Sequence, residues 1–304
     1  MGPASLGAFF PLAARNGSLV PIEDLTVHVE SQAMRYALSV FEGMRGYLPS
    51  AGRGERAVMF EVRAHLERLA SSLLLAGLAA EDEAREIERQ ADEALEALLV
   101  EVGPAEDVYA RVAVSAASAG DLGEPAGLET TITLRSMGRK KWLRDGGGLV
   151  VSVGPRKGPG ELLSHQCKCV SHYAGARRAL LEAKANGYDS VVLRTFDGRL
   201  AEAPTANVFA VFGSEVVTPP LADAALAGIT RLTVLRLAGE AGLSPTERSL
   251  WPDDIAGADE VFLCGTGLEI APVATFDGRE LPAPGQVTRA LTQAFFSLVR
   301  GAGP

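Results

Sequence analysis

The sequence lacks the features that would place it among secreted, membrane-spanning or nucleic-acid-binding proteins. It has 304 residues but only three cysteines, Cys167, Cys169 and Cys264, so a disulfide framework is not expected and a reducing cytosol fits best. No apolar run approaches the roughly 20 residues of a membrane span. The formal net charge of −9 argues against general nucleic-acid or anionic-membrane binding, which needs clustered Lys and Arg.

The amino-terminal segment also lacks the pattern of a secretory leader. Residues 1–17, MGPASLGAFFPLAARNG, have no basic stretch before their apolar residues and soon reach Arg15 and a turn-like Asn16-Gly17. We therefore expect no signal peptide. Together with the low cysteine content, this predicts a cytoplasmic protein.

Common nucleotide, hydrolase and metal motifs are missing as well. There is no Walker A pattern, no GxGxxG between a strand and a helix, no GxSxG elbow, no HExxH and no paired CxxC. One cluster of nitrogen and sulfur ligands is present, at His165, Cys167, Cys169 and His172. Its spacing is too tight for the usual zinc knuckle, and no second cluster supports it, so we predict no metal site.

What the sequence does contain is enough apolar residues for a large core. Hydrophobic residues make up 47% of the chain, and the length predicts one large or two modest domains. Apolar periodicity predicts helices over 62–78, 83–102, 171–186, 230–243 and 286–300. Strands are predicted over 108–115, 130–134, 149–155, 189–196, 206–213, 215–220 and 259–267.

Turn signals organise these elements into a two-domain α+β fold. Asn16-Gly17 and Asp197-Gly198 are typical of tight turns between strands, and Thr230 is a plausible N-cap for the helix after Gly228. Hairpins outnumber clean βαβ units, which disfavours a doubly wound sheet. Residues 137–148, MGRKKWLRDGGG, are basic and then Gly-rich, and we read them as an interdomain or active-site loop, with an ordinary surface loop as the alternative. The predicted domains are 1–136 and 149–304.

Lys168 is the candidate nucleophile of the chain. If residues 165–169 formed a strand, Lys168 would face the opposite side from His165 and the two flanking cysteines. A lysine among apolar neighbours can be a nucleophilic amine that forms a Schiff base with an aldehyde cofactor. Taken alone, however, Lys168 is better explained as a solvated charge at a strand end, and only its sequence context favours a nucleophile.

Short motifs in a fixed order give Lys168 its context. They are YALSVFEGMRGY (36–47), HLERL (65–69), YAR (109–111), KCVSHY (168–173), GRLAEAPTANVF (198–209), AGIT (227–230) and GTGLEI (265–270). Together they make the chain, from about Ser31 to Val299, resemble the branched-chain aminotransferase group of class IV pyridoxal-phosphate (PLP) enzymes. The resemblance implies the two-domain fold-type IV architecture, similar to D-amino-acid aminotransferase. A small N-terminal α/β domain is then joined to a larger C-terminal mixed α/β, barrel-like domain.

The resemblance also implies which residues bind the PLP cofactor. Lys168 is similar to the internal-aldimine lysine, whose amine then moves a proton during catalysis. Glu202 is similar to the carboxylate that pairs with the pyridine nitrogen. The remaining cofactor positions are Tyr173 for the phenolic oxygen, and Arg68, Gly228, Ile229, Thr230 and Thr266 for the phosphate.

The substrate positions follow from the same motifs. Tyr36, Tyr109 and the turn Gly265-Thr266-Gly267 match groups that hold the α-carboxylate. Arg111 matches the arginine for the distal carboxylate of glutamate, whereas a strand-edge arginine is its ordinary explanation. Phe41 and Gly43 match pocket-wall positions, and Arg45 fits the motif but can equally brace a loop.

The resemblance implies an enzyme that moves an amino group from a branched-chain L-amino acid to 2-oxoglutarate. Two departures bear on the substrate, namely Val112 where relatives have proline, and the unusual stretch RKGPGELLSHQC before Lys168. Aminodeoxychorismate lyase and D-amino-acid or (R)-amine transaminase are therefore alternatives on the same scaffold. We expect small-molecule partners, no nucleic acid, no membrane, and a homodimer or larger homo-oligomer. A further hypothesis is that oxidation of Cys167 and Cys169 modulates activity.

Overall fold

The structure is a computed structural model that describes residues 8–50 and 54–301, and the chain forms two compact units. Unit one comprises the chain up to Gly138 together with Cys167–Ser171, and unit two comprises Arg139–Gln166 and the chain from His172 onward. The first seven residues, on which part of the signal-peptide expectation rests, lie outside the described residues. Within the described part of the chain, no helix is long and apolar enough to cross a membrane.

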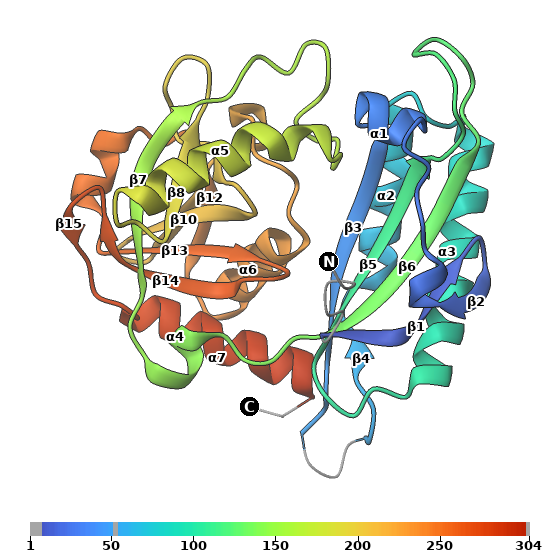
Figure 1. Cartoon of the computed structure of the whole chain (residues 1–304). Helices are drawn as coiled ribbons and strands as arrows, with labels where there is room; N and C mark the ends of the chain where they lie inside the picture. The colour runs from blue at the N-terminus through green and yellow to red at the C-terminus, as the bar shows by residue number, and fades with distance from the viewer. Residues whose placement is uncertain (1–7, 51–53, 302–304) are drawn as a thin grey trace. The chain divides into compact units, whose positions relative to one another are not determined.

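Unit one is built on a six-stranded antiparallel sheet with the strand order β2-β1-β6-β5-β3-β4 (Figure 1). Asn16 and Gly17 have positive φ angles of 49° and 82° and form the predicted two-residue hairpin turn. The elements of unit one are β1 (Phe9–Arg15), β2 (Ser18–Pro21), a 3-10 turn (Ile22–Asp24), α1 (Gln32–Tyr36), β3 (Ser39–Tyr47), β4 (Val58–Met59), α2 (Val62–Leu75), α3 (Glu81–Val102), β5 (Val108–Ala116) and β6 (Leu128–Ser136).

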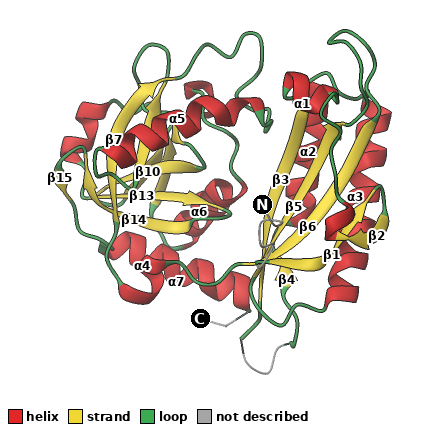
Figure 2. Ribbon diagram, in the orientation of Figure 1, coloured by secondary structure: helices red, strands yellow, loops and turns green. Residues whose placement is uncertain are grey.

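Helices α2 and α3 pack on each other and on this sheet because each has one apolar stripe (Figure 2). In α2 the stripe is Leu66, Leu69 and Leu73, all buried at helical spacing. The chain leaves α2 at Gly77, whose φ of +64° is accessible to glycine at little cost. The stripe of α3 is Ala84, Ala91, Ala94, Leu95 and Leu98.

Unit two contains a nine-stranded mixed sheet with the main order β12-β11-β10-β13-β14-β7-β8. The sheet pairs β7 in parallel with both β8 and β14, and α5 lies between β7 and β8 in the chain. The elements are α4 (Lys141–Asp145), β7 (Leu149–Arg156), α5 (Ser171–Ala185), β8 (Ser190–Arg194), β9 (Glu202–Ala203), β10 (Ala206–Phe212), β11 (Glu215–Thr218), α6 (Ile229–Glu240), β12 (Ser244–Glu247), β13 (Glu260–Gly265), β14 (Glu269–Phe276), β15 (Arg279–Glu280), α7 (Gln286–Arg300) and 3-10 turns at Leu221–Asp223 and Pro252–Gly257.

The core of unit two lies around its central strands β10 and β13, whose side chains are buried on both faces of the sheet. Strand β10 is buried along almost its whole length, as a strand covered on both sides requires. Helix α6 packs against α7, β12 and β13, and α7 also packs against β14. Ala179 and Ala183 of α5 pack on Val191 and Leu193 of β8.

The structure differs from the sequence-based expectations in four respects. Residues 165–169 are not a strand, because His165 and Gln166 form a turn and only Cys169 makes a β-bridge, to Val40. The N-cap of α6 is Gly228 and not Thr230, since Gly228 has the extended backbone (φ −69°, ψ 131°) and Thr230 already lies in the first turn. The predicted 137–148 loop contains a short helix, α4. Residues Cys167–Ser171, expected in the C-terminal domain, belong by their contacts to unit one.

Candidate functional site

The backbone around Lys168 is fixed to β3 and α2 of unit one. The Lys168 carbonyl accepts a hydrogen bond from the Phe41 N–H at 3.0 Å, and Val170 N–H donates to the Ser39 carbonyl at 2.9 Å. The Lys168 N–H donates to the Ser72 hydroxyl, also at 3.0 Å. Both the N–H and the carbonyl of Lys168 are therefore hydrogen-bonded, which fixes the backbone that carries its side chain.

Three predicted site residues meet at the Phe41 ring. The Lys168 ammonium lies 4.8 Å from the ring centroid, and the Arg111 guanidinium carbon lies 4.0 Å from it. The register of β3 and β5 produces this grouping, because Arg111 pairs with Gly43, two residues after Phe41 on β3. A candidate nucleophile, an aromatic wall and a candidate carboxylate-binding cation thus share one cluster.

Gly43 and Tyr109 are also brought together across β3 and β5. A Cβ atom at position 43 would lie 1.8 Å from the Tyr109 hydroxyl oxygen, so only glycine admits the tyrosine ring there. Tyr36 lies at the end of α1, where the Arg35 guanidinium carbon is 5.0 Å from its ring centroid. Arg45 is buried and donates to the carbonyls of Met137 and Gly138, each at 3.0 Å, which confirms that it braces a loop.

Arg68 belongs to a buried charged triad with Glu42 and His65. Arg68 donates to both Glu42 oxygens, at 2.6 and 2.8 Å, and His65 Nδ1 lies 2.7 Å from Glu42 Oε2. Burial alone would raise the pKa of the Glu42 carboxyl, but the Arg68 guanidinium and the hydrogen bonds from His65 and Arg68 lower it to about 2. Glu42 is thus a carboxylate at neutral pH and fixes the orientation of Arg68.

Glu202 lies in β9 of unit two and is bound at both carboxylate oxygens. Lys157 Nζ donates to Oε1 at 2.7 Å, and the Leu226 N–H donates to Oε2 at 2.9 Å. The side chains of Glu202 and Lys157 are both 17% exposed, so the pair is mostly removed from solvent. Each carboxylate oxygen can accept a second hydrogen bond, which leaves Glu202 able to accept one from a ligand.

The start of α6 has the form of an anion site. Gly228 precedes Ile229 and Thr230, both buried, and the first amides of any helix have no partner within it. A Cβ atom at position 228 would lie 2.0 Å from Asn207 Oδ1. Glycine is therefore required for the backbone to approach β10 as closely as it does.

The turn Gly265-Thr266-Gly267 connects β13 to β14, and sheet register places it near Glu202. Asn207 on β10 pairs with Glu202 on one side and with Cys264 on the other. A Cβ at Gly265 would lie 2.9 Å from the Thr205 carbonyl oxygen, so this turn also approaches the backbone of the neighbouring strand closely. Within unit two, the structure thus gathers Glu202 and the Gly265–Gly267 turn at one end of the sheet.

Tyr173 lies in the first turn of α5 and is partly buried. It belongs to unit two with Glu202, whereas Lys168 and Arg68 belong to unit one. The placement of the predicted residues around one cofactor therefore stays a prediction.

The cysteines beside Lys168 are buried thiols. Cys167 Sγ lies 3.5 Å from the Ser72 carbonyl oxygen, and Cys169 Sγ lies 3.1 Å from Ser171 Oγ. The hydrogen bond with Cys169, together with burial, raises the pKa of the Cys167 thiol above its ordinary value. Because the thiolate is the reactive form, this works against the oxidation hypothesis. Among the residues that the structure describes, no group of three or more His, Cys, Asp or Glu side chains could hold a metal ion.

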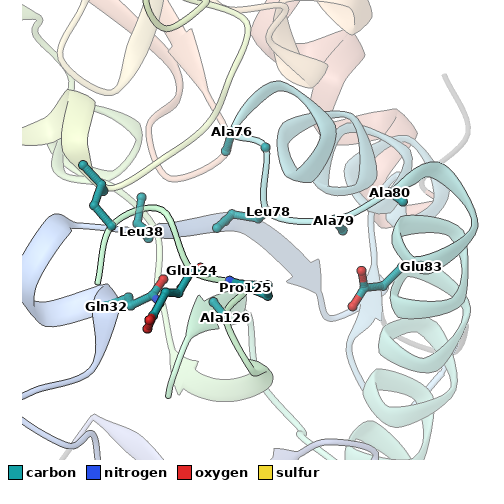
Figure 3. Close-up of a pocket in the computed structure, with 12 residues that line it drawn as sticks. Gln32, Leu38, Ala76, Leu78, Ala79, Ala80, Glu83, Glu124, Pro125 and Ala126 are labelled. Atoms are coloured by element: carbon teal, nitrogen blue, oxygen red, sulfur yellow. The ribbon is translucent and has the colours of Figure 1, made fainter. Parts of the chain in front are cut away.

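A cavity of about 530 Å³ lies in unit one beyond the end of α2 (Figure 3). Gln32 lies on its wall and donates to the carbonyls of Asp121 and Glu124. The cavity is lined by Gln32, Leu38, Ala76, Gly77, Leu78, Ala79, Ala80, Glu83, Leu122, Glu124, Pro125 and Ala126. No residue predicted to bind cofactor or substrate lines this cavity.

Comparison with known proteins assigns the family. Residues 39–276 match the sequence model of the family described as amino-transferase class IV. The chain belongs to the class IV aminotransferases. It is 31% identical over 296 residues to the branched-chain-amino-acid aminotransferase of Escherichia coli strain K12, covering 94% of this chain and 92% of that protein.

Solved structures of branched-chain amino acid aminotransferases are similar to this class IV aminotransferase over nearly its whole length. The branched-chain amino acid aminotransferase of Thermobaculum terrenum in its PLP form has a TM-score of 0.87 and 29% identity, covering 96% of this chain and 95% of that chain. The T.th. branched-chain amino acid aminotransferase, complexed with N-(5'-phosphopyridoxyl)-L-glutamate, has a TM-score of 0.83 and 26% identity, again covering 96% and 95%. The two-domain fold-type IV architecture and the PLP dependence expected from the sequence are confirmed.

The residues of this class IV aminotransferase fit PLP by their chemistry. The glycine-preceded start of α6 suits a phosphate, and the Glu202 carboxylate, with its remaining acceptor capacity, suits a protonated pyridine nitrogen. Glu42, Lys157 and Gln166 also contact the predicted site residues or their backbone, but the sequence alone does not single them out. Glu42 stands inside the FEGMR motif, which was a usable signal, whereas the other two lie in the stretch that departs from the relatives.

Proposed function

We propose that this class IV aminotransferase moves an amino group from a branched-chain L-amino acid to 2-oxoglutarate, with Lys168 as its catalytic residue. The observation that carries the proposal is the cluster on Phe41, where Lys168 and Arg111 approach the same ring at 4.8 and 4.0 Å. A nucleophilic amine and a carboxylate-binding cation beside one apolar wall suit a substrate pair of which one member is aliphatic and the other a dicarboxylate.

The cofactor positions follow from the chemistry of each side chain. When bound, PLP supplies the electron sink that stabilises negative charge at the substrate Cα. We assign its aldehyde carbon to Lys168, its pyridine nitrogen to Glu202 and its phenolic oxygen to Tyr173. Its phosphate is assigned to Arg68, to Thr266 and to the Ile229 and Thr230 amides after Gly228.

Lys168 Nζ moves the proton at the substrate Cα. Hydrogen bonds of 3.0 Å to the Phe41 N–H and the Ser72 hydroxyl hold its backbone. The amine therefore moves by rotation of the side chain about a fixed backbone. The apolar Phe41 ring beside it keeps water from this side of the amine. Positioned proton transfer of this kind contributes a rate factor on the order of 10² to 10⁴.

Substrate selection uses the strand pair β3 and β5. Arg111 would bind the distal carboxylate of glutamate or 2-oxoglutarate, as its planar guanidinium favours two parallel hydrogen bonds. Phe41 and Gly43 form the wall beside an aliphatic side chain. We assign the α-carboxylate to Tyr36, Tyr109 and the Gly265-Thr266-Gly267 turn. The T.th. relative, complexed with N-(5'-phosphopyridoxyl)-L-glutamate, supports glutamate as the second substrate.

A substrate panel tests the proposal. Purified enzyme is assayed with leucine, isoleucine, valine, D-alanine and (R)-phenylethylamine, each with 2-oxoglutarate or pyruvate as acceptor, and with aminodeoxychorismate for pyruvate release. Turnover should be fastest with one of the three branched-chain amino acids and 2-oxoglutarate. Pyruvate release from aminodeoxychorismate, or preference for D-alanine or the amine, would replace the proposed substrate while leaving the family assignment intact.

We also propose that the enzyme works in the cytoplasm as a homodimer or larger homo-oligomer. None of its three cysteines is joined in a disulfide, as expected for a reducing compartment. The oligomer is supported by the family resemblance. Light scattering of the purified enzyme tests it, and a monomeric mass at micromolar concentration would contradict it.

A further inference from the structure

The 224–227 segment, Ala224 to Ala227, lies outside the helices and strands of unit two. It runs between the 3-10 turn Leu221–Asp223 and the start of α6, and Ala225 within it is buried. Backbone amides and carbonyls in such a place need partners, because leaving them unpaired costs free energy. In this chain, side chains supply those partners.

Four side chains bind the backbone of the 224–227 segment. Two come from sheet strands, since Glu202 of β9 accepts from Leu226 N–H at 2.9 Å and Asn207 of β10 donates to the Leu226 carbonyl at 3.0 Å. The other two come from the 157–166 loop, which runs between β7 and α5. From that loop, Lys157 Nζ donates to the Ala224 carbonyl at 2.5 Å and to Glu202 at 2.7 Å.

Gln166 makes the most specific of these contacts. Its Nε2 donates to the Ala225 carbonyl at 2.7 Å, and its Oε1 accepts from the Ala227 N–H at 2.9 Å. One planar amide thus pairs with the donor and the acceptor that flank Leu226, as a neighbouring strand would. The Ala227 N–H lies one residue before Gly228, where α6 is capped.

We propose that Gln166 is a positioning residue for the phosphate of PLP. It holds the 224–227 segment so that the amides of Ile229 and Thr230 are already aligned when the phosphate arrives. Without its two hydrogen bonds the segment must be ordered at the moment of binding, which weakens affinity. Lys157 supports the same segment from its other end and balances the charge of Glu202. The inference rests on the proposed PLP positions, and Gln166 touches neither substrate nor reacting atoms in this account.

The test compares PLP release from holoenzymes. Gln166→Met keeps the length and volume of the side chain but removes both hydrogen bonds, and Gln166→Leu is the second variant should Met fail to fold. Gln90→Met is the matched control, because Gln90 on α3 is exposed and its amide nitrogen donates to Glu86 on the same helix. PLP release is followed by its absorbance after dilution, and melting temperatures are measured with and without PLP.

Gln166→Met should release PLP about tenfold faster than wild type, in keeping with two lost hydrogen bonds of ordinary strength. The difference between the holo and apo melting temperatures should shrink, whereas Gln90→Met should match wild type in both readouts. A purely structural role would lower both melting temperatures equally and leave release unchanged, and that result overturns the inference alone. A wild-type protein that binds no PLP overturns the proposed function and this inference together.

Discussion

Arg68 donates hydrogen bonds to both carboxylate oxygens of Glu42, from Nε at 2.6 Å and from Nη2 at 2.8 Å. Glu42 is completely buried and also contacts His65. A two-point pairing of this kind fixes the plane of the guanidinium. The residue assigned to the cofactor phosphate is therefore oriented by a carboxylate 26 positions earlier in the chain.

Stability should depend on the charge of Glu42. Its pKa is lowered from 4.5 to about 2, so the stabilisation is complete above pH 4.5 and is lost as the pH falls toward 2, with a total on the order of 3 kcal/mol. Urea denaturation of wild type and Glu42→Gln across pH 3 to 7 measures this. The variant should be less stable by about 3–5 kcal/mol at pH 7, because the charge of Arg68 stays buried without its partner.

The exposed Glu96 on α3 gives a matched control. Glu96→Gln should stay within about 0.5 kcal/mol of wild type at pH 7. If Glu42→Gln kept the full acid-dependent loss of stability between pH 4.5 and 3, the depressed pKa assigned to Glu42 would be wrong.

Replacing Arg111 should raise KM for 2-oxoglutarate much more than KM for the branched-chain amino acid. Arg111→Lys keeps a positive charge but loses the planar, two-point geometry for a carboxylate. We expect KM for 2-oxoglutarate to rise about 10- to 100-fold, with KM for leucine changed less than threefold. Arg85→Lys on the exposed face of α3 is the control. Equal rises in both KM values would remove Arg111 from the distal-carboxylate site.

The start of α6 should tolerate no side chain at position 228. Gly228→Ala places a methyl group 2.0 Å from Asn207 Oδ1, so the loop must shift and PLP affinity should fall at least tenfold. Gly239→Ala, in the same helix, would meet only Pro245 Cγ at 3.8 Å. That control should raise stability by roughly 0.4–1 kcal/mol, as helical glycine-to-alanine changes do. Titration of each apoenzyme with PLP measures the contrast, and unchanged affinity in Gly228→Ala would count against the phosphate site.

Elements with strong local patterns could be predicted from the sequence. The helix predicted over 286–300 is α7, Gln286–Arg300, because its apolar spacing and the glycines at both ends are local signals. The Asn16-Gly17 hairpin was found for the same reason. The strand considered for 165–169 does not form, since the backbone of Lys168 is held by Ser72 and Phe41, which lie 96 and 127 residues earlier in the chain.

Some residues of the candidate site could likewise be predicted from the sequence, and others could not. Lys168 and Glu202 could be proposed because short motifs surround each of them. Lys157 and Gln166 could not, because their partners lie 45 and 59 residues further along the chain and no local spacing relates them. Their contacts with the backbone of the 224–227 segment become apparent only from the three-dimensional structure.

Covalent attachment of PLP to Lys168 is the proposed feature on which the other cofactor positions depend. The direct measurement is reduction of the holoenzyme with borohydride, followed by proteolysis and mass spectrometry of every lysine-containing peptide. We expect a phosphopyridoxyl group on Lys168 alone, bleaching of the yellow absorbance, and no covalent label in Lys168→Ala. A label on Lys157 or on another lysine, or a wild-type protein that carries no label, would contradict it.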